Sequence, residues 1–347
     1  MFRVTEQTPF IWNGSVAGAM TLPPLGEALS MPILTALTAA LAWLSRQGTR
    51  ALAVSIFFGL SVPGLASYVK PYLGETVFVL LLFSYLRTDP SAFRGYIKAP
   101  RLVVVATLWI MVAVPALFGV AYVLFGVRES MPALYTIMIL QSAIAPITSS
   151  AAFAALMGLD VAFSLVTLIA CSAISPITTV AFSYLFLGTA LFSPIELGVK
   201  LFFFFAASGA VVYAIRRVVG QPWIERQKEP IDGLNVIAVF IFAVAAMDGV
   251  PRHVMADPLF ALELFALVIL LTGMLIGLSA LVFTRAGIDR GLVIGLLSGF
   301  RNVGVIMAAL GSALPDLAWF YFAMAQFPMY LLPAFVKPLA RRLTEKR

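Results

Sequence analysis

Arg301 is the residue whose position predicts most about this chain, because it lies at the centre of an otherwise apolar segment. The stretch from Gly291 to Gly311 reads GLVIGLLSGFRNVGVIMAALG, which is long enough to cross a bilayer. A charge near the midplane costs roughly 2.5–3.5 kcal/mol and is normally kept only where it faces a cavity or a partner. The planar fork of N–H donors suits a carboxylate, sulfonate or phosphate. We therefore expect an anion site, unless Arg301 instead serves carbonyls that the interruption frees.

A second apolar stretch, about 150 residues earlier, is interrupted in a similar way by Ala145-Pro146-Ile147-Thr148-Ser149-Ser150. Two interrupted membrane segments at corresponding positions of two halves indicate the central site of a transporter. We expect Asn302 and the hydroxyls of Thr148, Ser149 and Ser150 to line that site. The alternative is that Asn302 caps the second half-helix and that the hydroxyls serve helix packing.

Three further polar positions are candidates for function. Ser164 and Thr167 stand at i and i+3 on one predicted helix and therefore share a face, where packing accounts for them at least as well as ligand binding. Glu263 lies about one turn inside another predicted helix. It could carry a proton during transport or pair with Arg252, and carboxylates near helix ends also reach the interface.

The composition excludes several classes of protein. Of the 347 residues, 61% are hydrophobic and 11% are charged, and the mean hydropathy is +1.01. One cysteine (Cys171) and one histidine (His253) do not suffice for a disulfide framework, a metal cluster or a catalytic triad. We therefore expect no enzyme, no metal and no cofactor. The net charge of +7 lies in short loops between apolar blocks, so we expect the lipid bilayer as a partner and no nucleic acid.

The apolar residues come in blocks of about 20, the length that spans a bilayer. Loops rich in Lys and Arg alternate with loops that are poor in them, and the positive-inside rule places the rich loops in the cytoplasm. The prediction is a multi-pass protein of the cell inner (cytoplasmic) membrane with its C-terminus in the cytoplasm. Its ten core helices are predicted at 51–69, 72–87, 102–126, 132–157, 161–187, 195–218, 234–250, 259–284, 288–311 and 316–337.

Ten helices divide into two sets of five, and an odd number of helices in each half makes the repeats inverted in topology. The interrupted helices are then the fourth and the ninth. An extra N-terminal segment is either a further span or an interfacial helix. The predicted parts are a tail (1–27), the extra hydrophobic segment (28–46), the two five-helix repeats (50–190 and 191–340) and a basic cytoplasmic tail (341–347).

Three stretches carry a resemblance to a known family. They are LLLFSYLRTDPSAFRGYIKAPRLVVV, the run Ala145–Ser150 followed by LDVAFS and ISPIT, and GIDRGLVIGLLSGFRNVGVIMAAL. From about Ala51 to Ala340 the chain resembles the bile acid:sodium symporter superfamily, which also contains the arsenite exporters. The resemblance implies a core of crossed, broken helices, a panel of helices that moves against it, and small organic anions as substrates.

Sodium coupling is where the chain departs from that family. Three positions that match family sodium ligands keep an oxygen donor: Ser150, Ser164 and Asn302. Four do not: Leu297 replaces a glutamate, Arg301 a glutamine, Ala151 an asparagine and Ile110 a glutamine. Loss of the carboxylate removes what would offset the desolvation of sodium, and a guanidinium repels it. Conventional sodium symport is therefore not expected.

The arsenite branch has a cysteine in a run where this chain has Ile147, so arsenite export is not expected either. The function that we predict is a secondary transporter that moves a small organic anion by alternating access. Arg301 is its fixed counter-charge. Exchange, uniport, and sodium- or proton-coupled symport stay open as alternatives, and a carrier-derived sensor is a more distant one.

Overall fold

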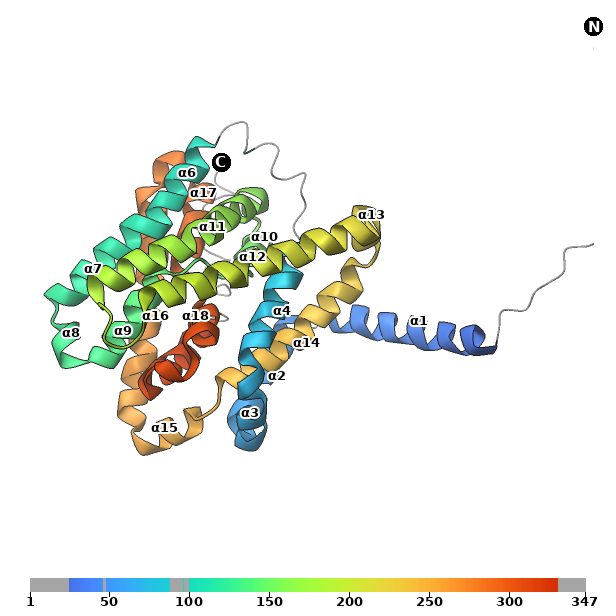
Figure 1. Cartoon of the computed structure of the whole chain (residues 1–347), viewed down its shortest axis with the longest axis horizontal. Coiled ribbons are helices and arrows are strands. Elements are labelled where there is room, and N and C mark those ends of the chain that lie inside the picture. The colour runs from blue at the N-terminus through green and yellow to red at the C-terminus, as the bar shows by residue number, and fades with distance from the viewer. Residues whose placement is uncertain (1–24, 46–47, 88–95, 97–99, 330–347) are drawn as a thin grey trace, which may run out of the picture. The chain divides into compact units, whose positions relative to one another are not determined.

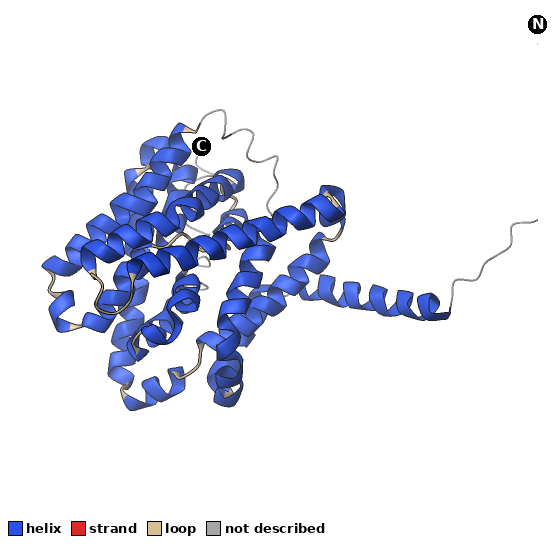
Figure 2. Cartoon of the chain, viewed as in Figure 1, coloured by secondary structure: helices blue, strands red, loops and turns tan. Residues whose placement is uncertain are grey.

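The computed structural model describes residues 25–45, 48–87, 96 and 100–329. Within this part of the chain the regular elements are helices, and the one exception is an isolated bridge between Pro146 and Arg301 (Figure 2). The expectation of an all-α protein is thus confirmed. Several sequence predictions fall outside the described residues: the N-terminal tail, most of the 88–99 loop, the end of the last helix and the basic C-terminal tail.

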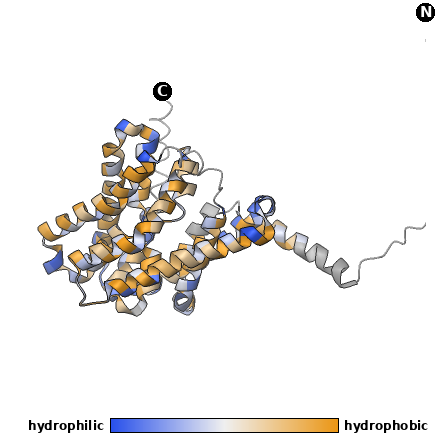
Figure 3. Ribbon diagram, turned by 45° about the horizontal axis from the view of Figure 1, so that its top comes forward, coloured by the Kyte–Doolittle hydropathy of each residue, from blue (hydrophilic) through white to orange (hydrophobic). Residues whose placement is uncertain are grey.

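Six helical segments of the described chain are long and apolar enough to cross a bilayer, as expected for a multi-pass membrane protein. Figure 3 shows hydrophobic residues along the lengths of these helices and hydrophilic ones gathered near several helix ends. The six segments are Gly64–Leu86, Arg101–Leu124, Val161–Phe186, Pro194–Val219, Lys228–Ala256 and Pro258–Val282.

Fewer segments qualify than the ten that were predicted, for local reasons. The segments predicted at 132–157 and 288–311 are each interrupted, so neither forms one long helix. The segment predicted at 51–69 is not continuous, because Pro63 begins a new helix after Val62. A proline fits the first turn of a helix but interrupts a helix interior, since it has no N–H to donate.

The described part of the chain divides into two units, with the boundary between residues 40 and 41. Helix α1 (Leu25–Ser45) begins in the first unit and ends just inside the second. The hydrophobic segment predicted at 28–46 is therefore helical over its described residues, and its placement in a membrane stays a prediction.

In the second unit, one set of helices packs together and is called the first helix group: α2, α3, α4, α12 and α14. Figure 1 shows α4 beside α14 in this group. The bounds are α2 (Gly48–Ser61), α3 (Pro63–Val69), a 3-10 turn (Lys70–Tyr72), α4 (Leu73–Leu86), α12 (Pro194–Val219), α13 (Gln221–Arg226), α14 (Lys228–Ala246) and α15 (Val250–Ala256).

The second helix group is built around α11, with α6, α7, α9, α10, α16 and α17. The two groups are in contact: α11 packs along α12, and α18 packs against α9 of this group and against α4 and α12 of the first. The bounds are α6 (Arg101–Leu108), a π-helical turn (Trp109–Ala113), α7 (Val114–Leu124), α8 (Val127–Ser130), α9 (Pro132–Ala143), α10 (Ser150–Met157), α11 (Val161–Phe186), α16 (Pro258–Val282), α17 (Ile288–Gly299), α18 (Val303–Leu310) and a last helix described over 316–329.

Ionic contacts between loops follow the predicted topology. Arg87 pairs with Asp232 at 2.8 Å, and both belong to segments predicted on the Lys- and Arg-rich side. Lys70 pairs with Asp248 at 2.9 Å, and both belong to segments predicted on the opposite side. Each pair therefore joins two segments that the charge pattern assigns to one face of the membrane.

Candidate functional site

The two interrupted segments meet where their helices are broken, between α9 and α10 and between α17 and α18. This region, residues 144–150 and 298–302, is called the crossing. The N–H of Ile147 donates to the carbonyl of Phe300 at 2.8 Å, and the N–H of Asn302 donates to the carbonyl of Ala145 at 2.9 Å. These two bonds form the antiparallel bridge between Pro146 and Arg301. Backbone groups that each interruption frees are thus satisfied by the other, as burial requires.

The guanidinium of Arg301 donates hydrogen bonds to three further backbone carbonyls, and this residue is only 1% exposed. Nε donates to the carbonyl of Ser298 at 2.8 Å, and Nη1 donates to the carbonyl of Ile144 at 3.0 Å. Ile144 follows the last turn of α9 and Ser298 lies in the last turn of α17, so both carbonyls are among those that a helix end leaves without a helical donor. Arg301 therefore caps the C-terminal ends of α9 and α17, the first half-helix of each interrupted segment.

A third carbonyl is supplied by a distortion in the helix that contains Pro115. In the π-helical turn the N–H of Val114 bonds to the carbonyl of Trp109, five residues back. The next bond in that register would join residue 115 to Ile110, but proline has no N–H. The carbonyl of Ile110 is therefore left open, and Nη2 of Arg301 donates to it at 2.9 Å.

Hydroxyl groups on α11 and α10 support the crossing. Ser175 Oγ accepts from the N–H of Ala145 at 3.0 Å, and Thr179 Oγ1 donates to the carbonyl of Ala143 at 3.2 Å. Ser150 Oγ donates to the carbonyl of Ile147 at 2.7 Å. The two α11 residues were not among the predicted site residues, although the run ISPIT placed a serine and a proline at this point in the sequence.

The structure places five of the predicted site residues at the crossing: Arg301, Asn302, Thr148, Ser149 and Ser150. Asn302 begins α18 but makes no side-chain capping bond, which excludes capping as the role of this side chain. Ser149 likewise begins α10 without a side-chain cap, and Ser149 and Thr148 are half-buried.

Within the described chain, Ser164 and Glu263 make no side-chain hydrogen bond or ion pair with these five residues, and they belong to α11 and α16. Ser164 is buried on α11, and its hydroxyl has no hydrogen-bond partner in the described part of the chain. The same holds for Thr167, one turn along α11, and for Ser298 on α17. Glu263 is exposed on α16, and among the described residues no ion pair joins it to Arg252.

The close approach of α17 to α16 is a feature that the sequence prediction missed. Gly291, Gly295 and Gly299 recur every four residues and share one face of α17. A Cβ at Gly295 would lie 2.6 Å from the carbonyl oxygen of Ile276, and one at Gly299 would lie 2.4 Å from the Ile276 side chain. Small residues at this spacing let helix backbones approach closely in membranes, and the spacing itself was the signal.

The positive charge of Arg301 is stabilised without a carboxylate. Among the described residues no acidic side chain lies within ion-pair distance of it, and its oxygen partners are all backbone carbonyls. The C-terminal ends of α9 and α17 carry partial negative charge, which favours a cation there. The crossing therefore holds a buried net positive charge inside the second unit.

A cavity of about 490 Å³ lies between α4, α11 and α12. Its walls are mainly apolar, and its polar side chains are Tyr85, Ser172, Tyr213 and Arg216. Arg216 donates to the carbonyls of Tyr85 and Leu86 at 2.9 and 3.2 Å, at the end of α4. Because Ser172 and Pro176 of α11 line the cavity while Ser175 and Thr179 bond to the crossing, α11 separates the two.

A comparison with models of known protein families finds none that matches this chain, and a comparison with curated proteins finds no matching sequence. The resemblance to the bile acid:sodium symporter superfamily therefore rests on the three quoted stretches and stays a prediction.

Proposed function

We propose that this protein is a secondary transporter that moves a small organic anion by alternating access. The observation that carries the proposal is the crossing of two interrupted helices around an arginine whose charge no carboxylate neutralises within the described chain. A charge is kept at this depth at a cost, and charged residues inside membrane proteins normally serve transport or ligand binding. An anion that approaches the crossing would supply the missing counter-charge.

Inverted five-helix repeats are part of this proposal, and the half-helices support it. Helices α9 and α17 each have 12 residues, and α10 and α18 each have 8. The breaks pair in antiparallel fashion, as expected when the second copy starts on the opposite side of the membrane. We accordingly propose ten core helices, with the interrupted ones fourth and ninth.

The cavity beside α11 supports a small organic molecule as cargo. Its volume of about 490 Å³ lies within the usual range of small-molecule sites, roughly 300–1,000 Å³. Its Arg216 end belongs to the Lys- and Arg-rich face, which we propose to be cytoplasmic. In this proposal a substrate enters from the cytoplasmic side and reaches the crossing when α11 and α12 move apart.

Sodium is the main alternative coupling ion, and the hydroxyls of Ser164, Thr167 and Ser298 are the observation in its favour. They are buried oxygens without partners in the described chain, which a cation could use. Arg301 opposes this, because its charge repels a cation. We therefore keep an anion carrier without sodium as the proposal, with proton coupling through Glu263 as a further alternative.

A ligand-stabilisation experiment tests the proposal. Purified protein is melted with a panel of organic carboxylates, sulfonates and phosphates, in sodium-free and sodium-containing buffer. We expect at least one anion to raise the melting temperature of the wild type without sodium, and Arg301→Lys to reduce that shift, because a lysine keeps the charge but loses the planar fork. Proteoliposomes loaded with the stabilising anion then test exchange directly.

The matched control is Arg128→Gln, which removes an exposed arginine remote in sequence from the crossing. It should retain the full shift. Stabilisation that requires sodium, or that survives Arg301→Gln in folded protein, would contradict the role given to Arg301. A panel without any stabilising or exchanged anion would contradict anion transport itself.

A further inference from the structure

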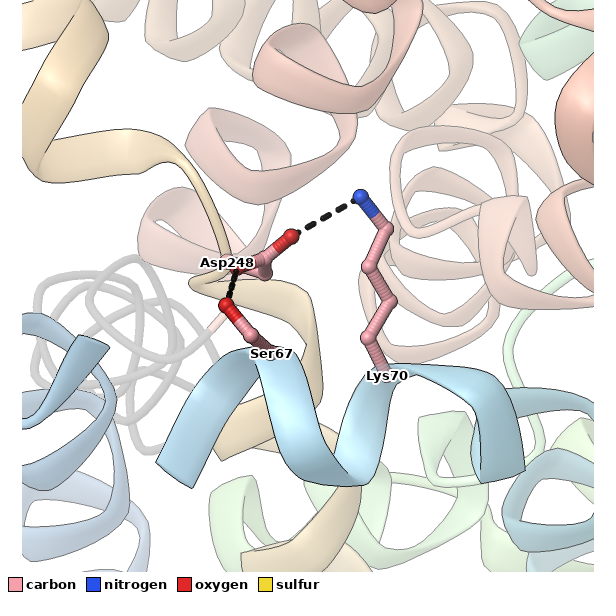
Figure 4. Close-up of polar contacts among 3 residues, drawn as sticks. All are labelled: Ser67, Lys70 and Asp248. Carbon is pink, nitrogen blue, oxygen red and sulfur yellow. Dashed lines mark hydrogen bonds and ion pairs between the residues drawn. The ribbon is translucent and has the colours of Figure 1, made fainter. Parts of the chain in front are cut away.

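Lys70 lies at the centre of a polar cluster that the site described above does not include. Its Nζ is 2.9 Å from Oδ2 of Asp248, and Ser67 Oγ donates to Oδ1 of the same carboxylate at 2.7 Å. Figure 4 shows the two residues reaching Asp248 from one helical stretch. Asp248 is in the turn between α14 and α15, and its side chain is only 11% exposed. The carboxylate is therefore held in place by two donors from the α3 side.

The same lysine also contacts an aromatic ring on another element. Nζ lies 4.6 Å from the centroid of the Trp319 ring, within the range of a cation–π interaction. The next residue, Phe320, is stacked on His253 of α15 with ring centroids 4.8 Å apart. Two successive residues of the last helix thus meet the α3 and α15 region.

The Lys70–Trp319 contact is one of several that join the two helix groups. Helix α11 also packs against α12, and Phe322 of the last helix packs against Phe242 of α14 with ring centroids 5.8 Å apart. Lys70 and Asp248 belong to segments adjoining α3, α4 and α14 of the first group. Trp319 belongs to the last helix, which packs against α16 of the second group where Phe265 and Phe327 meet at 5.6 Å. Lys70 therefore has its ion-pair partner within one group and its aromatic partner on the other side of the boundary.

The cluster and the cavity lie near different ends of α4. Lys70 precedes the start of α4, and the cavity's Arg216 bonds to carbonyls at the end of α4. A helix of 14 residues is about 20 Å long, so the cluster and the polar end of the cavity lie at opposite ends of that helix. The polar end of the cavity therefore lies near one end of α4 and Lys70 near the other.

We propose that Lys70, fixed by Asp248 and seated against Trp319, is a latch that holds the two helix groups together on the face opposite the Arg216 end of the cavity. This inference rests on the proposed function, because a latch of this kind gives alternating access to a transporter. Opening that face separates Lys70 from Trp319 while the pair with Asp248 moves as one body. The Lys70–Trp319 contact is the one that breaks, and the pair with Asp248 keeps the Lys70 ammonium group in position to form it again.

The test measures the distance between the two groups in the full chain, reconstituted in lipid nanodiscs. Spin labels are attached at Val62→Cys in the first group and Phe125→Cys at the end of α7 in the second, both at exposed positions. Cys171 stays in place because its thiol is buried. Pulsed electron spin resonance then compares the wild type with Lys70→Met, Trp319→Leu and the double variant.

We expect one short-distance population in the wild type and a second population, several ångströms longer, in each single variant. The double variant should show no more of it than the singles, because both changes remove the same contact. Lys70→Arg keeps the charge and the ring contact and should remain closed. The matched control is Lys200→Met, which breaks an exposed pair with Glu196 at 2.8 Å in α12 and should leave the distances unchanged.

An unchanged distribution in Lys70→Met and Trp319→Leu, in protein that melts cooperatively, would overturn the latch. So would opening of equal size in Lys200→Met. If Lys70→Met does not fold, Asp248→Asn replaces it: the side chain keeps nearly the same volume but loses the charge that fixes Lys70, and this variant should show the same second, longer distance. The measurement needs no ligand, so an absence of anion transport would count against the proposed function and leave the result on the latch intact.

Discussion

Nη1 of Arg301 donates a 3.0 Å hydrogen bond to the carbonyl of Ile144, so a charged residue of one interrupted segment closes the open helix end of the other. The sequence left two roles open for Arg301, an anion site or a partner for freed carbonyls. In the structure Arg301 is a hydrogen-bond partner for freed carbonyls. An anion site is compatible with this role, because hydrogen bonds to neutral carbonyls leave the positive charge in place. An anion that reaches the crossing is therefore attracted by the fixed positive charge of Arg301.

Loss of Arg301 should destabilise the fold as well as any anion site. Arg301→Gln would leave up to three buried carbonyls without donors, at about 1–3 kcal/mol each, so we expect a clear fall in the melting temperature without ligand. Arg301→Lys should lie between the glutamine variant and the wild type. Exposed Arg128→Gln should melt like the wild type, and equal melting of all four proteins would refute the structural role.

The glycine face of α17 gives a second prediction. Gly295→Ala would place a Cβ 2.6 Å from the Ile276 carbonyl oxygen and should cost about 1–3 kcal/mol, the usual penalty for overpacking. Gly277→Ala is the matched control on the facing helix, because its Cβ would meet nothing within 4 Å. Thermal melting of both variants tests this. Equal melting temperatures would mean that α16 and α17 do not approach as closely as described.

The single cysteine allows a labelling test without any mutation. The thiol of Cys171 is fully buried in the hydrophobic cluster that also contains Ile110 and Met111, so N-ethylmaleimide should react with native protein very slowly and with unfolded protein fast. Ala173→Cys adds a thiol two residues further along α11, at an exposed position in the cavity wall, and should react quickly. Fast labelling of wild-type Cys171 would show that this part of the core opens readily.

The proposed sidedness is tested by exposed positions at opposite ends of the fold. Tyr72 lies beside the Lys70 cluster, and Val218 lies in the last turn of α12 after Arg216; both are exposed. In intact cells, a membrane-impermeant maleimide should label Tyr72→Cys and should label Val218→Cys only after the membrane is opened. The reverse pattern would invert the topology inferred from the charged loops.

Much of the fold could be predicted from the sequence, because helix ends are marked locally. The segment predicted at 161–187 is α11 (Val161–Phe186), whose start is capped by Asp160, and the one at 195–218 is α12 (Pro194–Val219), capped by Ser193. The two interruptions were also predicted, because a cluster of small, polar and proline residues in an apolar run weakens a membrane helix at that point. The break at Pro63 was missed, since the apolar pattern continues through it.

The candidate site was harder to predict, because its contacts depend on three segments meeting. That Ile110 has an open carbonyl follows from Pro115 only when the helix adopts π geometry, which the sequence pattern does not specify. The support from Ser175 and Thr179 depends on how α11 is rotated against α9. Local patterns indicated the residues at the breaks, and long-range packing decided which groups they satisfy.

The crossing also has a consequence for how the protein is made. The carbonyls of Ile110 and Ile144 find their donors on Arg301, more than 150 residues later in the chain. A ribosome that adds roughly 5–20 residues per second needs many seconds to cover that interval. During this time the first half resides in the membrane with its polar backbone groups unmatched. Synthesis of residue 301 is therefore the earliest point at which these carbonyls can reach the donors that they have in the folded protein.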